Sequence, residues 1–469
     1  MDYKLPNEVK IILNKFQKAN FQIYIVGGAV RDLLMGKVVR DWDFTTDAKP
    51  EEILKIIPGG FYDNKFGTVG LAVEDGVFEI TTMRKEGVYK DFRHPDSVSW
   101  TNKIEEDLGR RDFTVNAMAL VPKSVIASEA KQSSTEDRHV ASAPRDDKWM
   151  LADPFHGQQD IKDKLTRAVG DPNTRFQEDA LRLIRAIRFA TELDFDIDPK
   201  TFEAIQKNAP LLNEIANERV RDELFKILAS DNAYEGIIKL REAKLLQIIL
   251  PELEKCFGIV QQGPKHDRTY DIGEHSLLTL KYTPSGDSLV RLASLLHDIG
   301  KTDTVKASPD GNVTFYQHDV VGGEIVKKIA KRFNLSKKQA EKLSRLVRWH
   351  MFTVSEHQTD SAIRRFIKNV GLDNINDMMA LRIGDRLGGG TQTETSWRME
   401  KFQQRIKQVL KKPFSITDLK VNGNDVMEVL NIKPGPKVGE ILQKLFEEIL
   451  EDSNKNNRDY LLNRIKNIE

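Results

Sequence analysis

Residues 21–32 read FQIYIVGGAVRD, and residues 41–43 read DWD. The run 21–26 is mostly apolar, aromatic or β-branched, which is typical of a buried strand. Gly27 and Gly28 mark a tight turn, and residues 29–32 suit the start of a helix. The stretch therefore predicts a strand, a glycine turn and a helix, followed by an Asp-x-Asp pair.

The Asp-x-Asp pair indicates a site for phosphate chemistry. In an extended segment alternate side chains face the same side, so we expect Asp41 and Asp43 to lie together. Paired carboxylates hold the Mg²⁺ that assists phosphoryl or nucleotidyl transfer, and glycines let backbone N–H groups approach a triphosphate. Either half alone also occurs in solvated turns. The combination favours a nucleotide site with magnesium as cofactor.

Composition restricts the class of protein. The chain has 469 residues, of which 39% are hydrophobic and 30% charged, and its net charge is +1. This length predicts about two to four domains, and the small net charge leaves any RNA contact to local basic surface. The one cysteine, Cys256, excludes a disulfide framework and a cysteine-based zinc site. Without a signal-peptide core or an apolar run of ~18 residues, we expect a cytoplasmic protein with no membrane partner.

The pattern of the chain changes near Arg175. Before it, strand signals recur at Thr68–Val73 and Val77–Thr82, and residues 114–120 and 149–153 suit another strand pair or a strand–helix junction. After it, helical periodicity dominates to the end. Residues 124–147 are polar and lack apolar periodicity, so we interpret them as an exposed insertion without a functional role.

Glu79 lies within the strand predicted at 77–82. If this strand runs beside Asp41 and Asp43, the Glu79 carboxylate completes an acidic cluster. A single glutamate on a strand is as often merely exposed, so both interpretations stay open from the sequence.

Residues 109–116 read GRRDFTVN and set two arginines beside an acid. The planar guanidinium of Arg110 or Arg111 suits a triphosphate, or an acid such as Asp112 that holds the arginine in place. The alternative is a surface ion pair. We favour the nucleotide-binding interpretation, with Asn116 as part of the same motif.

Residues 178–188 read EDALRLIRAIR, which predicts one continuous helix. Residues three apart are neighbours on a helix, so Asp179 and Arg182 are expected side by side, and Arg185 and Arg188 continue the row. A carboxylate accepts from the exocyclic amino group that cytosine and adenine share, and a guanidinium donates to the adjacent ring acceptor. Guanine and uracil would leave Asp179 unpaired, which is costly in a dry site. The alternative is an intrahelical salt bridge.

Together these motifs resemble the successive signatures of class II tRNA nucleotidyltransferases. The matching stretches are Gly27–Asp32, Asp41–Thr46, Arg110–Ala117 and Glu178–Arg182. This family contains CCA-adding enzymes and bacterial poly(A) polymerases, within the polymerase-beta-like superfamily. The resemblance covers roughly residues 20–230.

The resemblance implies a role for each matched residue. Asp41 and Asp43 would hold Mg²⁺ and, with Glu79, form the catalytic carboxylates of a two-metal transfer. Asp179 and Arg182 would select the incoming base. The full nucleotide-binding set is Gly27, Gly28, Arg31, Arg110, Arg111, Asp112, Asn116, Asp179, Arg182, Arg185 and Arg188.

A second set of residues lies in the helical region. Residues 295–301 read LLHDIGK, which resembles the local signature of HD-domain metal phosphohydrolases. Imidazole and carboxylate ligands suit Mg²⁺ or a divalent transition metal. The candidate ligands are His275, His297, Asp298, His318, His350 and Asp385. The resemblance implies hydrolysis of phosphomonoesters or cyclic phosphodiesters, while a merely structural HD fold is the alternative.

We therefore predict an α+β protein. It has a small polymerase-beta-like α/β head, a helical neck that contains the base-selecting motif, an HD-type helical body and a helical RNA-binding tail. The predicted boundaries are 1–170, 171–235, 236–410 and 411–469.

The predicted activity is addition of C, C and A to tRNA 3′ ends from CTP and ATP without a nucleic-acid template. Poly(A) polymerase and partial CC- or A-adding enzymes share the same head motifs and stay as alternatives. From another class, the chain would be an HD phosphohydrolase with an inactive head, which the intact Asp41 and Asp43 pair disfavours.

Overall fold

The computed structural model describes residues 5–62, 67–74, 76–87, 96–122, 149–261, 270–307, 313–352, 354–355, 358–410 and 416–468. Residues 124–147, which we interpret as an insertion, lie outside this described part. Contacts divide the chain into two compact units, Met1–Pro251 and Glu252–Glu469. The fold is α+β as predicted, with a mixed sheet in the first unit and helices in the rest.

Within the described residues, seven strands form the sheet of the head, in the order β3-β4-β5-β2-β1-β8-β9. Neighbours are antiparallel except β2 and β5, which are parallel. The bounds are β1 (Ile23–Val26), β2 (Asp43–Thr46), β3 (Phe61–Tyr62), β4 (Thr68–Val73), β5 (Gly76–Thr82), β8 (Ala119–Pro122) and β9 (Trp149–Ala152). The strands predicted at 68–73, 77–82 and 149–153 are confirmed. Only the end of the strand predicted at 114–120 is correct, because residues 114–116 form a 3-10 turn, η1.

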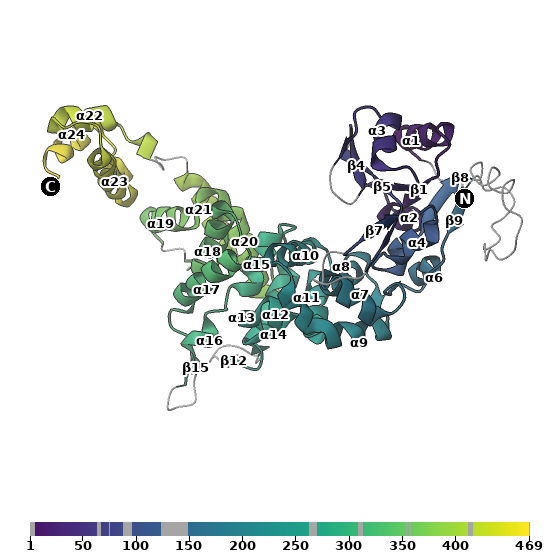
Figure 1. Cartoon of the computed structure of the whole chain (residues 1–469). Coiled ribbons are helices and arrows are strands. Elements are labelled where there is room, and N and C mark those ends of the chain that lie inside the picture. The colour runs from purple at the N-terminus through teal and green to yellow at the C-terminus, as the bar shows by residue number, and fades with distance from the viewer. Residues whose placement is uncertain are drawn as a thin grey trace, which may run out of the picture. The chain divides into compact units, whose positions relative to one another are not determined.

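Strand β1 is buried on both faces and separates two apolar cores. Ile23 and Ile25 pack into one core, and Tyr24 and Val26 pack into the other, because side chains alternate across a strand. Figure 1 shows α1 (Asn7–Lys18) and α3 (Pro50–Ile56) on the side of the first core and α4 (Ile104–Gly109) on the side of the second. The remaining elements of the head are α2 (Gly28–Leu34), α6 (Gly157–Lys162), β6 (Arg84–Glu86) and β7 (Val98–Trp100).

A helical neck follows the sheet within the first unit. A two-stranded parallel ladder, β10 (Leu165–Thr166) with β11 (Asp196–Ile197), joins its parts. Helix α8 packs against α10 and α11. The neck helices are α7 (Pro172–Glu178), α8 (Leu181–Leu193), α9 (Pro199–Asn208), α10 (Asn217–Ala229), α11 (Ala233–Glu242) and α12 (Leu246–Ile249).

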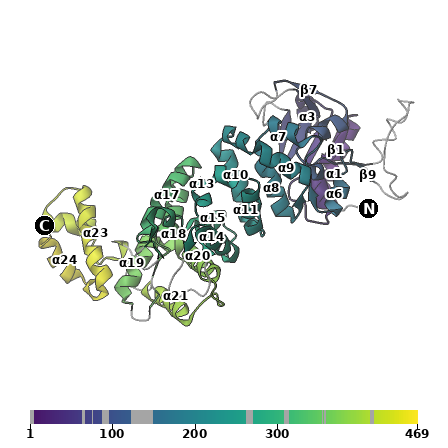
Figure 2. The same cartoon turned by 90° about the horizontal axis from the view of Figure 1, so that it is seen from below.

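The second unit is built almost entirely from helices. Figure 2 shows α14, α15, α18 and α20 gathered into one bundle, in agreement with their contacts. Helices α22, α23 and α24 enclose a separate small core around Leu445, Ile449 and Leu461. The bounds are α14 (Ile272–Tyr282), α15 (Ser288–Leu296), α16 (Lys301–Thr304), α17 (His318–Arg332), α18 (Lys337–Arg348), α19 (Asp360–Val370), α20 (Ile375–Gly388), α21 (Trp397–Val409), α22 (Gly423–Leu430), α23 (Pro436–Glu451) and α24 (Arg458–Lys466). Among the helices that the structure describes, none combines the length and apolar character that crossing a bilayer requires.

The helix predicted over residues 178–188 is interrupted, which corrects that expectation. Helix α7 ends at Glu178 and α8 begins at Leu181, with Asp179 in an extended conformation between them. The Asp179 carboxylate accepts a hydrogen bond from the backbone N–H of Leu181 at 3.1 Å. Aspartate competes for nearby backbone donors and favours the start of a helix over its interior, which explains the break.

Candidate functional site

The acidic pair lies at the start of β2. Trp42 and Phe44 are buried in the first core, so the intervening Asp43 and the preceding Asp41 face the other side. Asp43 is the direct register partner of Glu79 on the parallel strand β5. The structure thus brings Glu79 beside the acidic pair, where its side chain is exposed.

These three carboxylates repel one another. Burial, the charge of Glu79 and the charge of Asp41 together raise the pKa of Asp43 to about 6, although Arg111 opposes the shift. A carboxylate that is crowded by like charges is stabilised by a cation. Aspartate and glutamate oxygens are the ligands that Mg²⁺ prefers, so the residues present fit a magnesium site.

The glycine turn brings backbone and guanidinium close together. Gly27 has φ +71°, a conformation that favours glycine, and a Cβ there would lie 3.0 Å from a terminal nitrogen of Arg111. Gly28 begins α2. Arg111 is paired with the buried Asp107 at 3.5 Å, which holds its guanidinium near Asp43.

Arg31 is oriented by two partners. Its Nη1 donates to the Asn116 side-chain oxygen at 2.7 Å, and its Nε donates to Asp32 at 2.9 Å. Residue Asn116 belongs to η1, which contacts α2. The sequence places Arg31 and Asn116 in different motifs, and the fold joins them.

The buried Asp112 of the head forms an ion pair with the partly exposed Arg185 of α8. The Arg185 Nε donates to Asp112 at 2.9 Å. Arg185 is the main opposing charge that overcomes the effect of burial and lowers the pKa of Asp112 to about 2. Asp112 therefore acts as the holder of an arginine, one of the two roles expected for this motif.

A cavity of about 990 Å³ joins most of the expected residues. Those that line it are Gly27, Gly28, Arg31, Asp41, Asp43, Arg111, Asp112, Asn116, Arg185 and Arg188. Its lining also includes Lys37, Arg40, Phe189 and residues 229–232, which we did not expect. Lys37 and Arg40 stand just before Asp41, so basic residues flanking the acidic pair were a usable signal. Mixed cationic and acidic walls suit a magnesium–triphosphate complex.

Glu223 is a second unexpected residue. It lies on α10, is 4% exposed, and approaches the Arg188 Nε at 3.1 Å. Its other oxygen lies 4.0 Å from Arg185. Glu223 thus pairs with Arg188 and lies close to Arg185, both on α8. No local motif in the sequence predicted this long-range contact.

Three expected nucleotide-binding residues do not line the cavity. Arg110 pairs with Asp107 at 2.8 Å. Asp179 faces Arg219 on α10 at 3.4 Å. Arg182 donates to Glu178 at 2.6 Å and to the Arg110 carbonyl at 3.0 Å. Asp179 and Arg182 thus have partners of their own in Arg219 and Glu178, and their pairing around a base stays a prediction.

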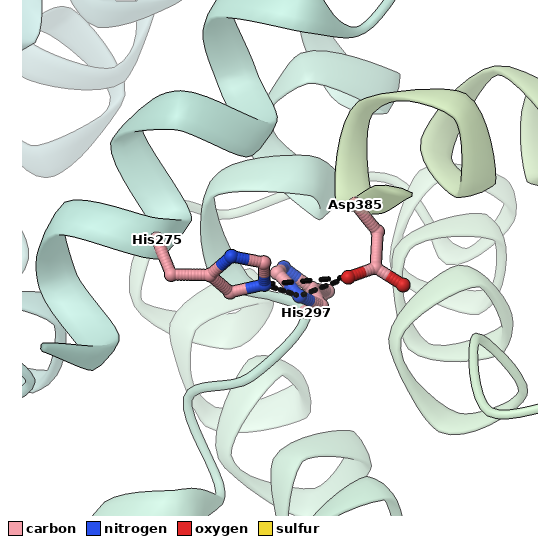
Figure 3. Close-up of side chains that lie close together, drawn as sticks. All are labelled: His275, His297 and Asp385. Carbon is pink, nitrogen blue, oxygen red and sulfur yellow. Dashed lines mark hydrogen bonds and ion pairs between the residues drawn. The ribbon is translucent and has the colours of Figure 1, made fainter. Parts of the chain in front are cut away.

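All six predicted ligands of the second unit converge. Figure 3 shows the His275 and His297 rings pointing at the Asp385 carboxylate, with His275 Nε2 3.2 Å from His297 Nε2 and 3.3 Å from Asp385 Oδ1. Asp298 Oδ1 lies 3.3 Å from His318 Nε2 and 3.5 Å from His350 Nε2. Five of the six residues are buried, namely His275, His297, Asp298, His318 and His350. This geometry offers a cation nitrogen and oxygen ligands without any thiolate.

Comparison with known proteins identifies the family. A profile of the Poly A polymerase head domain matches residues 23–167, and one of tRNA nucleotidyltransferase domain 2 matches residues 320–465. A third, of the RNA- and SrmB-binding site of polymerase A, matches residues 194–257. An A-adding tRNA nucleotidyltransferase of Deinococcus radiodurans is 34% identical over 90% of each chain. The chain belongs to the tRNA nucleotidyltransferase family.

Two further relatives match this chain over nearly its full length, one in sequence and one in structure. A CCA-adding enzyme of Ligilactobacillus salivarius is 30% identical over 99% of this chain and 98% of its own. The crystal structure of the Bacillus stearothermophilus CCA-adding enzyme in complex with CTP has a TM-score of 0.69 at 24% identity, and the match covers 99% and 98% of the two chains. This nucleotidyltransferase therefore has the fold that the sequence predicted.

Proposed function

We propose that this nucleotidyltransferase adds C, C and A to the 3′ end of tRNA, using CTP and ATP. The observation that carries the proposal is the cavity in which Asp41 and Asp43 face Arg31, Arg111 and Arg185. Relatives named CCA-adding enzymes over the full length support the choice of nucleotides and acceptor. We expect the reaction to take place in the cytoplasm, where tRNA, CTP and ATP occur together.

In this proposal the chain's own residues position the reactants. Asp41 and Asp43 would hold Mg²⁺, which when bound supplies charge stabilisation at the reacting phosphate. Arg31 and Arg111, each held by an acid or amide, neutralise the triphosphate without having to reorganise. The tRNA 3′-hydroxyl oxygen attacks the α-phosphorus, and the bond from that phosphorus to pyrophosphate breaks.

Selection of the base is a separate part of the proposal. We assign it to Asp179 and Arg182, supported by their motif and by Arg185 and Arg188, which share α8 with Arg182 and line the cavity. Asp179 has to leave Arg219 before it can accept from a cytosine or adenine amino group. Replacing Asp179 with alanine should relax the preference for CTP over UTP.

The experiment supplies purified protein with tRNA that lacks CCA, or that ends in CC, and gives CTP or ATP separately. We expect two C residues on the first substrate and one A on the second. Addition of A alone would identify an A-adding enzyme, and long A tails on either substrate would identify a poly(A) polymerase. Asp41→Asn and Asp43→Asn should abolish addition, whereas Glu51→Gln, an exposed acid on α3, should not.

A second activity is favoured by the histidine cluster. We propose that it binds a divalent cation and hydrolyses phosphomonoesters or 2′,3′-cyclic phosphodiesters. The convergence of His275, His297, Asp298, His318, His350 and Asp385 supports this proposal.

The test measures hydrolysis with Mg²⁺, Mn²⁺ or Ni²⁺, as release of phosphate from a phosphomonoester and as opening of a 2′,3′-cyclic phosphodiester to a monoester. His297→Ala should abolish this hydrolysis and leave CTP incorporation unchanged. The control substitution His156→Asn, in the head, should leave the hydrolysis unchanged. Hydrolysis that survives His297→Ala would contradict the assignment.

A further inference from the structure

Three arginines of the cavity share one aromatic neighbour, Phe189 of α8. The centre of its ring lies 4.1 Å from the guanidinium carbon of Arg188, 5.3 Å from that of Arg185 and 5.7 Å from that of Arg31. All three distances fall within the roughly 6 Å over which an aromatic ring attracts a cation. The ring therefore connects α2, which carries Arg31, with the two arginines of α8.

The ring of Phe189 is held in place by its helix and by Phe113. Phe189 is 7% exposed and lies one helical turn after Arg185, so these two side chains are neighbours on the surface of α8. The fully buried Phe113 packs against the ring edge to face, with the centroids 5.6 Å apart and an angle of 71° between the planes. Since the ring is buried and Arg188 covers it, it is not a stacking surface for a nucleobase.

The arginines around the ring repel one another. Burial lowers the pKa of Arg188, and the charge of Arg185 lowers it further, against the opposing effect of Glu223. Carboxylate and amide partners bind a guanidinium through N–H groups in its plane, and they leave its flat face without a partner. An aromatic ring attracts that face and uses none of the N–H donors. The donors that remain are then available for phosphate oxygens.

We propose that Phe189 is a positioning residue whose ring gathers the guanidinium groups of Arg31, Arg185 and Arg188 into one surface for the triphosphate of the incoming nucleotide. The proposal rests on the nucleotide addition proposed above and deepens it, because it names what keeps the arginines together before the nucleotide binds. Without the ring, part of the binding free energy of a triphosphate has to be used to collect them. The loss should therefore depend on the phosphates and not on the nucleoside.

The experiment measures the Kd of CTP and the Kd of CMP for the full-length protein with Mg²⁺, by titration calorimetry. Phe189→Leu keeps an apolar side chain but removes the ring. We expect it to weaken binding of CTP about tenfold and binding of CMP less than about twofold, so the preference for CTP falls at least about fivefold. A loss of folded protein affects both ligands alike, so the ratio of the two Kd values reports on the phosphates.

Two further substitutions separate the aromatic ring from general packing. Phe189→Tyr keeps the ring and should retain the ratio of the parent protein. Phe176→Leu is the matched control, because Phe176 is fully buried on α7 of the same unit and its ring has no guanidinium neighbour in the described part of the chain. An unchanged ratio in Phe189→Leu, or an equal fall in Phe176→Leu, would overturn the proposal. Phe189→Met replaces the leucine variant if that variant does not fold.

A double-mutant cycle tests whether the ring acts through an arginine. Arg188→Ala should weaken binding of CTP less in the Phe189→Leu background than in the parent, whereas additive losses would overturn the proposal. A parent protein that binds CTP no more tightly than CMP would overturn it as well. These titrations need no tRNA. A ratio that falls as expected without addition of C or A therefore contradicts only the proposed function, and addition with an unchanged ratio contradicts only the role of Phe189.

Discussion

The environment of Asp43 lowers the stability of the folded protein when this carboxylate is charged. Its ordinary pKa is 3.8, and burial with repulsion from Glu79 and Asp41 raises it to about 6. The folded state therefore binds this proton more tightly than the unfolded state. As the pH rises from about 4 to 6, the unfolded state releases its proton first, and stability falls by up to about 3 kcal/mol before levelling off.

Replacing Asp43 with asparagine should thus stabilise the metal-free protein at pH 7 and leave its stability near pH 4 almost unchanged. At pH 7 we expect the melting temperature of the first unit to rise by about 5–10 °C, while nucleotide addition is lost. Calorimetry in the presence of a chelator at both pH values measures this, with Glu51→Gln as control. An equal effect at both pH values would show that charge repulsion is not the cause.

Glu223 acts through the arginines that it holds. Removing one member of a buried ion pair leaves the other uncompensated, so Glu223→Ala should destabilise the first unit by about 3 kcal/mol. It should also lower kcat/KM for CTP at least about tenfold, because Arg188 loses its orientation. Glu223→Gln, which keeps an acceptor, should recover part of this loss.

Glu192 gives the matched comparison for Glu223. It approaches the same Arg188 at 3.7 Å but is 34% exposed. A pair in that environment contributes less than about 1 kcal/mol, so Glu192→Gln should have a small effect on stability. If both substitutions act equally, burial of Glu223 is not what orients the arginine.

At the scale of elements, the break between α7 and α8 and the pairing of β8 with β9 matter most. Asp179 lies in an extended conformation between the two helices, and its side chain faces Arg219. Strands β8 and β9 form an antiparallel pair whose last register partners are Pro122 and Trp149.

Residues 123–148 should be replaceable by a four-residue turn that contains Asn-Gly. A shorter closure costs less entropy, so we expect the first unit to gain roughly 1–2 kcal/mol in stability. Incorporation of CTP and ATP should stay within about twofold of the parent, as measured on tRNA lacking CCA. A large loss of activity with an intact melting transition would assign a function to the segment, against our interpretation.

At the scale of the whole molecule, the chain has two compact units with separate candidate sites. The cavity with Asp41 and Asp43 belongs to residues 1–251, and the histidine cluster belongs to residues 252–469. A ligand stabilises only the unit that binds it, and it does so by about 2.7 kcal/mol at a concentration one hundred times its Kd.

Calorimetry should accordingly resolve two unfolding transitions. Mg²⁺ with CTP should raise the first-unit transition, and Mn²⁺ without nucleotide should raise the second-unit transition. Asp41→Asn/Asp43→Asn should remove only the first shift and Asp298→Asn only the second. If either ligand moved both transitions equally, the two sites would be coupled.

Local patterns were enough to predict the main elements and most of the residues that line the cavity. Alternating or periodic apolar residues predicted β1, β4, β5 and α8, because a strand or helix repeats its burial every two or 3.6 residues. Residue type and order also singled out Asp41 and Asp43, and a family resemblance singled out six residues of the second unit that the structure brings close together.

Only the tertiary structure decided which charged side chains pair with one another. The sequence offers Arg110 and Arg111 equally, but only Arg111 reaches the cavity, because Arg110 is drawn to Asp107 and Glu86. The neighbours Asp43 and Glu79 meet through a parallel register that no local pattern encodes. Likewise, the two oxygens of Asp298 face different histidine pairs only because α14, α15, α17, α18 and α20 pack around it. A charged side chain pairs with whichever opposite charge the fold brings within reach, and distance along the chain does not determine that.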